Sequence, residues 1–368
     1  MRKKGYIILG IVFALILAII IASLIWYNIQ IGKPNKNNSE ESERIVEIKS
    51  GTSTNDIIKL LKQNDIIRSE LASKIYIGLN EVNNLQAGKY SFTGNEKLSE
   101  VIETISAGKV MDETITITFL EGKNMRSIAS TIAEKTNNTS NDVYKLLENK
   151  EYIASLVQKY WFLTKDIQNT NLYYPLEGYL YPDTYSFENK DVTVEKIFEK
   201  MLDKMDKILS KYKNVKTLEQ YSIHDILTMA SIVELEGNNA TNRAKIARVI
   251  YNRLASNMSL GSDVTTYYAI KVDISERDLY AKEINTYNAY NTRGPNMEGK
   301  LPVGPIACVS EESIKAVLSP ASGSYLYFVS DKNGEIYFSN TYEEHQQTIA
   351  NLRKKGLWYE YDNNEAGN

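Results

Sequence analysis

The chain has 368 residues, of which 43% are hydrophobic and 24% are charged, and its formal net charge is -3. This length leaves room for an anchor and one or two folded domains, and the composition excludes general disorder. The weak net charge gives no electrostatic reason to expect nucleic acid as a partner. One cysteine and two histidines exclude an internal disulfide and a cysteine-based metal cluster, so we expect neither a metal site nor a cofactor.

The N-terminal segment has the composition of a membrane-spanning helix. Residues 6–27 are uncharged and consist mainly of Ile, Leu, Val and Ala. About 22 helical residues cross a hydrocarbon layer of about 30 Å, and a cleaved signal peptide has a shorter apolar region. Trp26 and Tyr27 suit the bilayer interface, and the basic residues 2–4 precede the run. We therefore predict a single-pass protein of the cell membrane with a cytoplasmic N-terminus and the rest of the chain outside.

We expect an α+β fold with five segments. These are a cytoplasmic tip with a transmembrane anchor (1–31), a flexible linker (32–44), a small α+β module (45–110), a mixed α+β catalytic domain (111–358) and a polar tail (359–368). The module begins with an alternating strand at 45–48, a turn at Gly51 and a helical pattern. Such units resemble the glycan-binding LysM fold, although a purely structural platform fits the pattern equally well.

The larger domain repeats the strand, glycine turn and helix. An alternating strand at 114–119 leads through Gly122 into a helix, and long helical patterns follow at 194–213 and 222–235. Late in the chain, two strand-like runs flank the sequence Asn333-Gly334, which predicts a β-hairpin. Cys308 lies in an apolar run, and we expect it to be a small buried hydrophobe.

The segment 222–237 (SIHDILTMASIVELEG) is the most informative in the chain. Ser222 and Asp225 form a capping box at the helix start, and Gly237 stops the helix. Glu234 lies in the last turn, at the border of the apolar stripe, where the helix dipole and apolar neighbours both favour a protonated carboxyl group. That state suits a general acid. The alternative is a surface carboxylate on a frayed helix end. Glu236 is expected to face solvent.

Seven short blocks occur in order along the larger domain. They are Glu177–Tyr185 (EGYLYPDTY), Met229–Glu234 (MASIVE), Tyr251–Leu254 (YNRL), Ser262-Asp263, Tyr290–Thr292 (YNT), Pro302–Ile306 (PVGPI) and Tyr325–Ser330 (YLYFVS). No single block is specific, but the ordered set, over about residues 114–350, resembles the YceG-like (MltG) family of endolytic murein transglycosylases. The anchor and the small module fit this family as well.

The resemblance implies a lytic transglycosylase that cleaves the MurNAc–GlcNAc β-1,4 bond of nascent peptidoglycan strands and ends their elongation. Glu234 matches the catalytic glutamate, which protonates the leaving oxygen and then draws the proton from the muramyl C6 hydroxyl, so that a 1,6-anhydro ring forms. One carboxylate suffices because the nucleophile is intramolecular. Peptidoglycan synthases are the implied neighbours. The substrate-binding residues expected from the matched blocks are Ser262, Asp263, Thr265, Tyr290, Asn291 and Glu177.

The chain departs from the family pattern around the Ser262 block. Gly261 stands where the family usually has Gln, and Val264 stands where it has Pro, so contacts in the groove can differ. Arg293 stands where the family often has Tyr. Two other functions remain open: a non-catalytic peptidoglycan-binding scaffold, and a hydrolytic muramidase that uses Glu177 or Asp263 as a second carboxylate. Anhydro ends, reducing ends or intact bound strands would distinguish the three.

Overall fold

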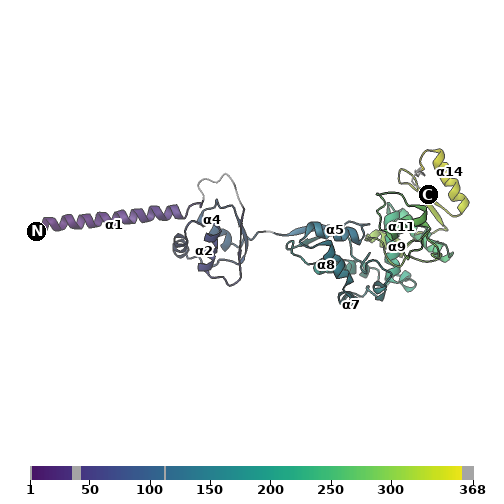
Figure 1. Cartoon of the computed structure of the whole chain (residues 1–368), viewed down its shortest axis with the longest axis horizontal. Coiled ribbons are helices and arrows are strands. Elements are labelled where there is room, and N and C mark those ends of the chain that lie inside the picture. Colours follow the sequence, from purple (N-terminus) through teal and green to yellow (C-terminus); the bar gives the residue numbers. More distant parts are fainter. Residues whose placement is uncertain (1, 35–42, 112, 359–368) are drawn as a thin grey trace. The chain divides into compact units, whose positions relative to one another are not determined.

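The computed structural model describes residues 2–34, 43–111 and 113–358. The described residues form two compact units with a boundary between Glu113 and Thr114. Both units combine helices with small antiparallel sheets, so the predicted α+β class is confirmed (Figure 1). Most of the predicted linker and the predicted tail 359–368 lie outside the described residues.

The first unit begins with the long helix α1 (Arg2–Gln30), whose stretch from Tyr6 to Gln30 is long and apolar enough to cross a membrane. None of that stretch is buried against the rest of the unit. The chain then folds into a small module, in which β1 pairs with β2 in antiparallel register. Its elements are β1 (Arg44–Ile48), α2 (Thr54–Gln63), α3 (Glu70–Leu79), β2 (Gly88–Phe92) and α4 (Leu98–Ser106).

The module folds because each element buries one apolar face. Val46 and Ile48 alternate inward on β1, and α2 buries Ile57, Ile58 and Leu61 beneath its Ser53 N-cap. Ile31, just beyond α1, packs against this core. That contact ties the last residue of the predicted anchor segment (1–31) to the module. Glycan binding by the module stays a prediction.

The second unit follows the predicted order of elements. The predicted hairpin is confirmed as β5 and β6, and Gly334 takes a positive φ of 80° in its turn. The elements are β3 (Ile115–Thr118), α5 (Met125–Lys135), α6 (Ser140–Glu148), α7 (Lys150–Lys159), η1 (Lys165–Gln168), β4 (Thr184–Phe187), α8 (Val194–Ser210), η2 (Lys216–Glu219), α9 (Ile223–Glu236), α10 (Ala240–Ala255), α11 (Asp263–Ile270), α12 (Ala281–Ile284), α13 (Glu311–Leu318), β5 (Tyr327–Ser330), β6 (Ile336–Ser339) and α14 (Tyr342–Lys354).

Helix α9 is the centre of the second unit. The predicted capping box of Ser222 and Asp225 begins it, and every residue from Ile226 to Val233 is buried. It packs against α10, α11 and α13, and the α9 and α11 labels lie together in Figure 1. Cys308 is buried, as predicted. The last turn of α9 emerges from this core, and it carries both Glu234 and Glu236.

Candidate active site

The last turn of α9 directs its two carboxylates to different sides. Residues two apart on an α-helix point about 200° apart, since each residue turns the chain by about 100°. Glu234 therefore faces α10 and the start of α13, whereas Glu236 faces the start of α11. Gly237 follows at once, and a Cβ atom there would meet Arg243 Cγ at 2.5 Å. The close approach of Arg243 thus fixes how the chain leaves the helix.

Glu234 is held by protein groups on both of its oxygens. Arg243 Nη2 donates to Glu234 Oε1 at 2.8 Å, and the backbone N–H of Ser310 donates to Oε2 at 2.8 Å. The Ser310 hydroxyl donates to the same oxygen, and only 4% of the Glu234 side chain is exposed. The expectation of mainly apolar neighbours was wrong, because α10 and α13 bring an arginine and two further donors. Little of the Glu234 side chain is therefore accessible to a polymeric substrate.

Glu236 has a different environment. It is half-buried rather than facing solvent as predicted, because the start of α11 packs over it. Ser262 Oγ donates to Glu236 Oε1 at 2.6 Å. Burial raises the pKa of the Glu236 carboxyl above its ordinary value, the bond from Ser262 lowers it, and the negative charge of Asp263 raises it. The positive charges of Arg293 and Arg253 act in the lowering direction. A carboxyl group with a raised pKa is the kind that can donate a proton near neutral pH.

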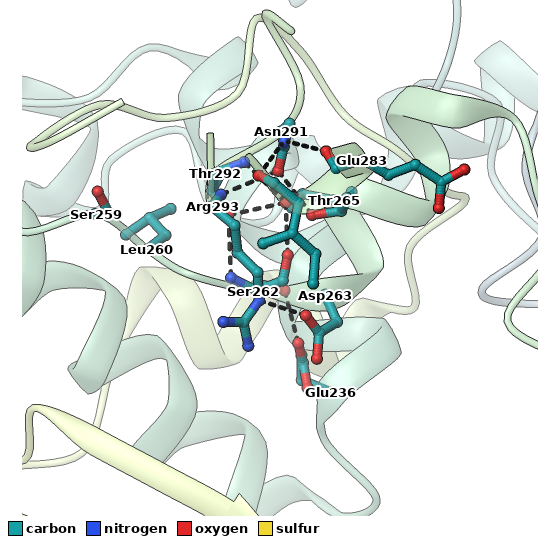
Figure 2. Close-up of polar contacts among 12 residues, drawn as sticks. Glu236, Ser259, Leu260, Ser262, Asp263, Thr265, Glu283, Asn291, Thr292 and Arg293 are labelled. Atoms are coloured by element: carbon teal, nitrogen blue, oxygen red, sulfur yellow. Dashed lines mark hydrogen bonds and ion pairs between the residues drawn. The ribbon is translucent and has the colours of Figure 1, made fainter. Parts of the chain in front are cut away.

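A network of hydroxyl groups positions Ser262 (Figure 2). Ser262 is the N-cap of α11, yet its hydroxyl caps no backbone group of that helix, because it donates to Glu236. Its backbone N–H donates to Thr292 Oγ1 at 3.0 Å, and the hydroxyls of Thr292 and Thr265 are 2.8 Å apart. Thr265 and Thr292 are both fully buried. They therefore support Ser262 from inside the fold.

Asn291 locks the neighbouring loop in place. Its Oδ1 accepts a hydrogen bond from Thr266 Oγ1 at 2.7 Å, and its Nδ2 donates to the carbonyls of Glu283, Ile284 and Thr286. Only 1% of Asn291 is exposed. The structure therefore brings Asn291 to the Ser262 network but commits its side chain to internal bonds (Figure 2).

Charged groups line the outer side of Glu236. Asp263 and Arg293 form an ion pair in which both side chains are partly exposed, and Figure 2 draws this pair beside Glu236. Arg253 donates from Nε to the Leu326 carbonyl and from Nη1 to the Leu260 carbonyl, each at 2.6 Å. The sequence had marked Arg293 only as a departure from the family pattern, and it gave Glu236 no role. Neither position could be oriented before the packing of α11 was known.

Tyr290 and Glu177 belong to another part of the core. The Tyr290 hydroxyl accepts a hydrogen bond from the backbone N–H of Tyr173, and its ring packs against Tyr268. Both Glu177 oxygens accept from the backbone N–H of Met125 at 3.0 Å, and Tyr268 Oη donates to Oε2 at 2.9 Å. Burial raises the pKa of Glu177 to about 7. These bonds join α5 to α11, so both residues stabilise the domain from inside.

The described surface hollows do not include either carboxylate of α9. One hollow is lined by residues of β3, α5 and the segment between them, among them Thr118, Phe119 and Lys123. A second lies against β6 and α14, where Ser339 and Glu343 line it. The site is therefore defined by its contacts and its electrostatics.

The chain is similar to one protein family and to several known proteins. The model of the YceG-like family matches residues 46–351. An endolytic murein transglycosylase of Bacillus subtilis (strain 168) is 34% identical over 332 residues, which are 89% of this chain and 90% of the relative. An endolytic murein transglycosylase of Streptococcus pneumoniae serotype 2 is 28% identical, over 83% of this chain and 57% of the relative. A crystal structure of a YceG-like protein of Listeria monocytogenes is 33% identical, with a TM-score of 0.60, over 84% of this chain and 100% of that chain.

Proposed function

Because the chain belongs to the YceG-like family, we propose that it is an endolytic peptidoglycan lytic transglycosylase. It cleaves the MurNAc–GlcNAc β-1,4 bond within glycan strands and leaves a 1,6-anhydro-MurNAc end. The names of the relatives from Bacillus subtilis and Streptococcus pneumoniae support this activity. The site supports it through a half-buried carboxyl group of raised pKa at the end of α9.

We assign the acid/base role to Glu236, and the Ser262–Glu236 contact carries this assignment. Ser262 donates to Glu236 Oε1, which leaves Oε2 to carry the proton for the glycosidic oxygen. Glu234, the residue that the sequence favours, is the alternative, but its two oxygens already accept three donors. A general acid needs a transferable proton and access to substrate, and Glu236 fits both needs better than Glu234.

One carboxyl group can complete the reaction. Glu236 gives its proton to the bridging oxygen while the C1–O bond breaks, and the sugar ring takes up positive charge. The resulting carboxylate then accepts the proton of the muramyl C6 hydroxyl as that oxygen bonds to C1. Because the nucleophile belongs to the same sugar, a second carboxylate that activates water is not needed. Arg293 and Arg253 stabilise the carboxylate between the two proton transfers.

The remaining predicted site residues divide into two groups. Asp263 is partly exposed beside Glu236, and we place it against the glycan. Ser262 is itself buried, and we assign it the positioning of Glu236. Thr265, Tyr290, Asn291 and Glu177 are buried, and we assign them the support of that surface from inside.

We further propose that α1 anchors the protein in the cell membrane with its N-terminus in the cytoplasm. The basic residues before the apolar run support this orientation. The catalytic unit then lies outside the membrane, where new strands emerge, and peptidoglycan synthases are its expected neighbours. Cleavage there would end the elongation of a strand. The module of residues 45–110 is suited to hold glycan if it is LysM-like.

The decisive experiment compares three Glu→Gln variants of the full chain in detergent. The variants are Glu236→Gln, Glu234→Gln and the control Glu312→Gln, whose exposed side chain binds Arg243 at 2.6 Å. Each is incubated with peptidoglycan, and the products are identified by mass spectrometry. We expect anhydro-muramyl ends from the wild type, from Glu312→Gln and from folded Glu234→Gln, and none from Glu236→Gln.

Other products would decide against parts of the proposal. Activity in Glu236→Gln together with its loss in folded Glu234→Gln would return the role to Glu234. Reducing ends in place of anhydro ends would identify a hydrolytic muramidase. Intact strands that co-sediment with the wild-type protein would identify a binding scaffold.

A further inference from the structure

Helix α3 presents an apolar stripe to the outside of the first unit. Leu71, Ile75 and Leu79 follow one another at intervals of four residues, so they share one face of the helix. Their exposed fractions are 59%, 39% and 71%. The opposite face, with Ala72 and Ile77, is buried in the module. It is unfavourable to expose three large apolar side chains on one helix face to water, and such a patch indicates an interaction surface.

The same helix lies against the outer end of α1. Arg68, just before α3, donates from Nη1 to the Ile29 carbonyl at 3.3 Å and from Nε to the Lys33 carbonyl. Further along α3, Tyr76 is close enough to Tyr27 for the two hydroxyls to interact electrostatically. The hydrogen bonds of Arg68 therefore hold the start of α3 next to the outer end of α1.

The attachment has a second support from the module core. The backbone N–H of Leu98 donates to the Ile31 carbonyl at 3.1 Å, and the Ile31 side chain packs against the module core. The first described residues after α1 are thus part of the folded module. The module is held at the end of the helix.

This placement sets the height of α3 relative to a bilayer. Trp26 and Tyr27 end the uncharged run of α1, and such aromatic residues lie at the boundary between hydrocarbon and headgroups. Since Arg68, just before α3, bonds to the carbonyls of Ile29 and Lys33, the start of α3 lies close to that boundary too. Lys33 and Lys74 are exposed near this end of α1 and on α3, where they can meet lipid phosphates, while the apolar stripe can enter the acyl boundary. Amphipathic helices that lie in the membrane surface bury their apolar face by about 5–10 Å.

We propose that the stripe Leu71–Ile75–Leu79 of α3 inserts into the outer lipid interface and holds the module on the membrane surface. The ligand is the lipid bilayer, with its acyl boundary and phosphate headgroups. This inference rests on the proposal that α1 is a membrane anchor, but it does not depend on the catalytic role of Glu236. The protein is then attached to the membrane at two points, α1 and α3, and not by α1 alone.

Site-directed spin labelling of the full chain in phosphatidylglycerol-containing nanodiscs tests the proposal. Cys308 is fully buried, so a nitroxide attaches to introduced cysteines in the folded protein. The labelled positions are Leu71→Cys, Ile75→Cys and Leu79→Cys, with Phe13→Cys in α1 as the lipid standard. Glu103→Cys, exposed on α4, is the water standard. Collisions with oxygen, which concentrates in lipid, are compared with collisions with a water-soluble nickel complex.

We expect the ratio of oxygen to nickel collisions at the three α3 positions to be severalfold higher than at Glu103→Cys and to approach that of Phe13→Cys. A ratio equal to that of Glu103→Cys, with Phe13→Cys in lipid, would overturn the insertion of α3 and leave the anchor intact. Low collision rates with both reagents would show a protein partner over the stripe and would also overturn it. If Phe13→Cys were not in lipid, the anchor proposal and this inference would both fail.

Discussion

Replacing Glu177 by Gln should destabilise the folded protein at acidic pH and stabilise it at basic pH. The carboxyl is 1% exposed and its pKa is raised by burial from an ordinary value of 4.5 to about 7. The folded protein therefore retains a proton between pH 4.5 and 7 that the unfolded chain releases, so the stability of the wild type falls as pH rises through this window and is level above it. The pKa rise of about 2.5 corresponds to roughly 3 kcal/mol in the free energy of unfolding.

The Gln side chain does not ionise, but it changes the bonds to Met125 and Tyr268. Altered buried hydrogen bonds cost about 1 kcal/mol at every pH. Glu177→Gln should thus be less stable than the wild type by about 1 kcal/mol near pH 4.5 and more stable by about 2 kcal/mol near pH 8. Urea unfolding followed by tryptophan fluorescence measures both values. An equal difference between the two proteins at both pH values would refute the reasoning.

Three further substitutions test the surroundings of α9. Ser262→Ala removes a hydrogen bond that lowers the pKa of Glu236, so the alkaline limb of kcat/KM should move to higher pH; an unmoved limb would argue against Glu236 as the acid. Asp263→Asn removes a charge that raises this pKa, so the same limb should move to lower pH, and an upward shift would contradict the assignment. Glu234→Gln leaves Arg243 without its buried partner and should lower the free energy of unfolding by about 3 kcal/mol; chemical denaturation near pH 7 that finds no loss would exclude this role.

The elements of the fold were largely predictable because their signals are local. The capping box at Ser222 and the Asn333-Gly334 turn each depend on neighbouring residues, and the structure has the helix and the hairpin at these places. The uncharged run of residues 6–27 needs only length and composition, and it corresponds to α1. Patterns of this kind do not require knowledge of how distant segments pack.

The site was only partly predictable because its geometry depends on long-range packing. The sequence located the last turn of α9 and the Ser262 block, and the structure joins them through the bond from Ser262 to Glu236. It could not determine which of Glu234 and Glu236 turns toward α11, since both lie in the same helical turn. The burial of Glu177, which the matched block had suggested as a substrate-binding residue, was equally hidden, because it depends on the packing of α5 and α11.

Gly237 limits how this region can vary. A methyl group at this position would collide with Arg243, the residue that also binds Glu234 and Glu312. Even alanine would push the arginine away and loosen the helical turn that presents Glu236. Among natural or designed variants, position 237 should therefore tolerate no side chain, although it makes no contact with substrate in the proposed reaction.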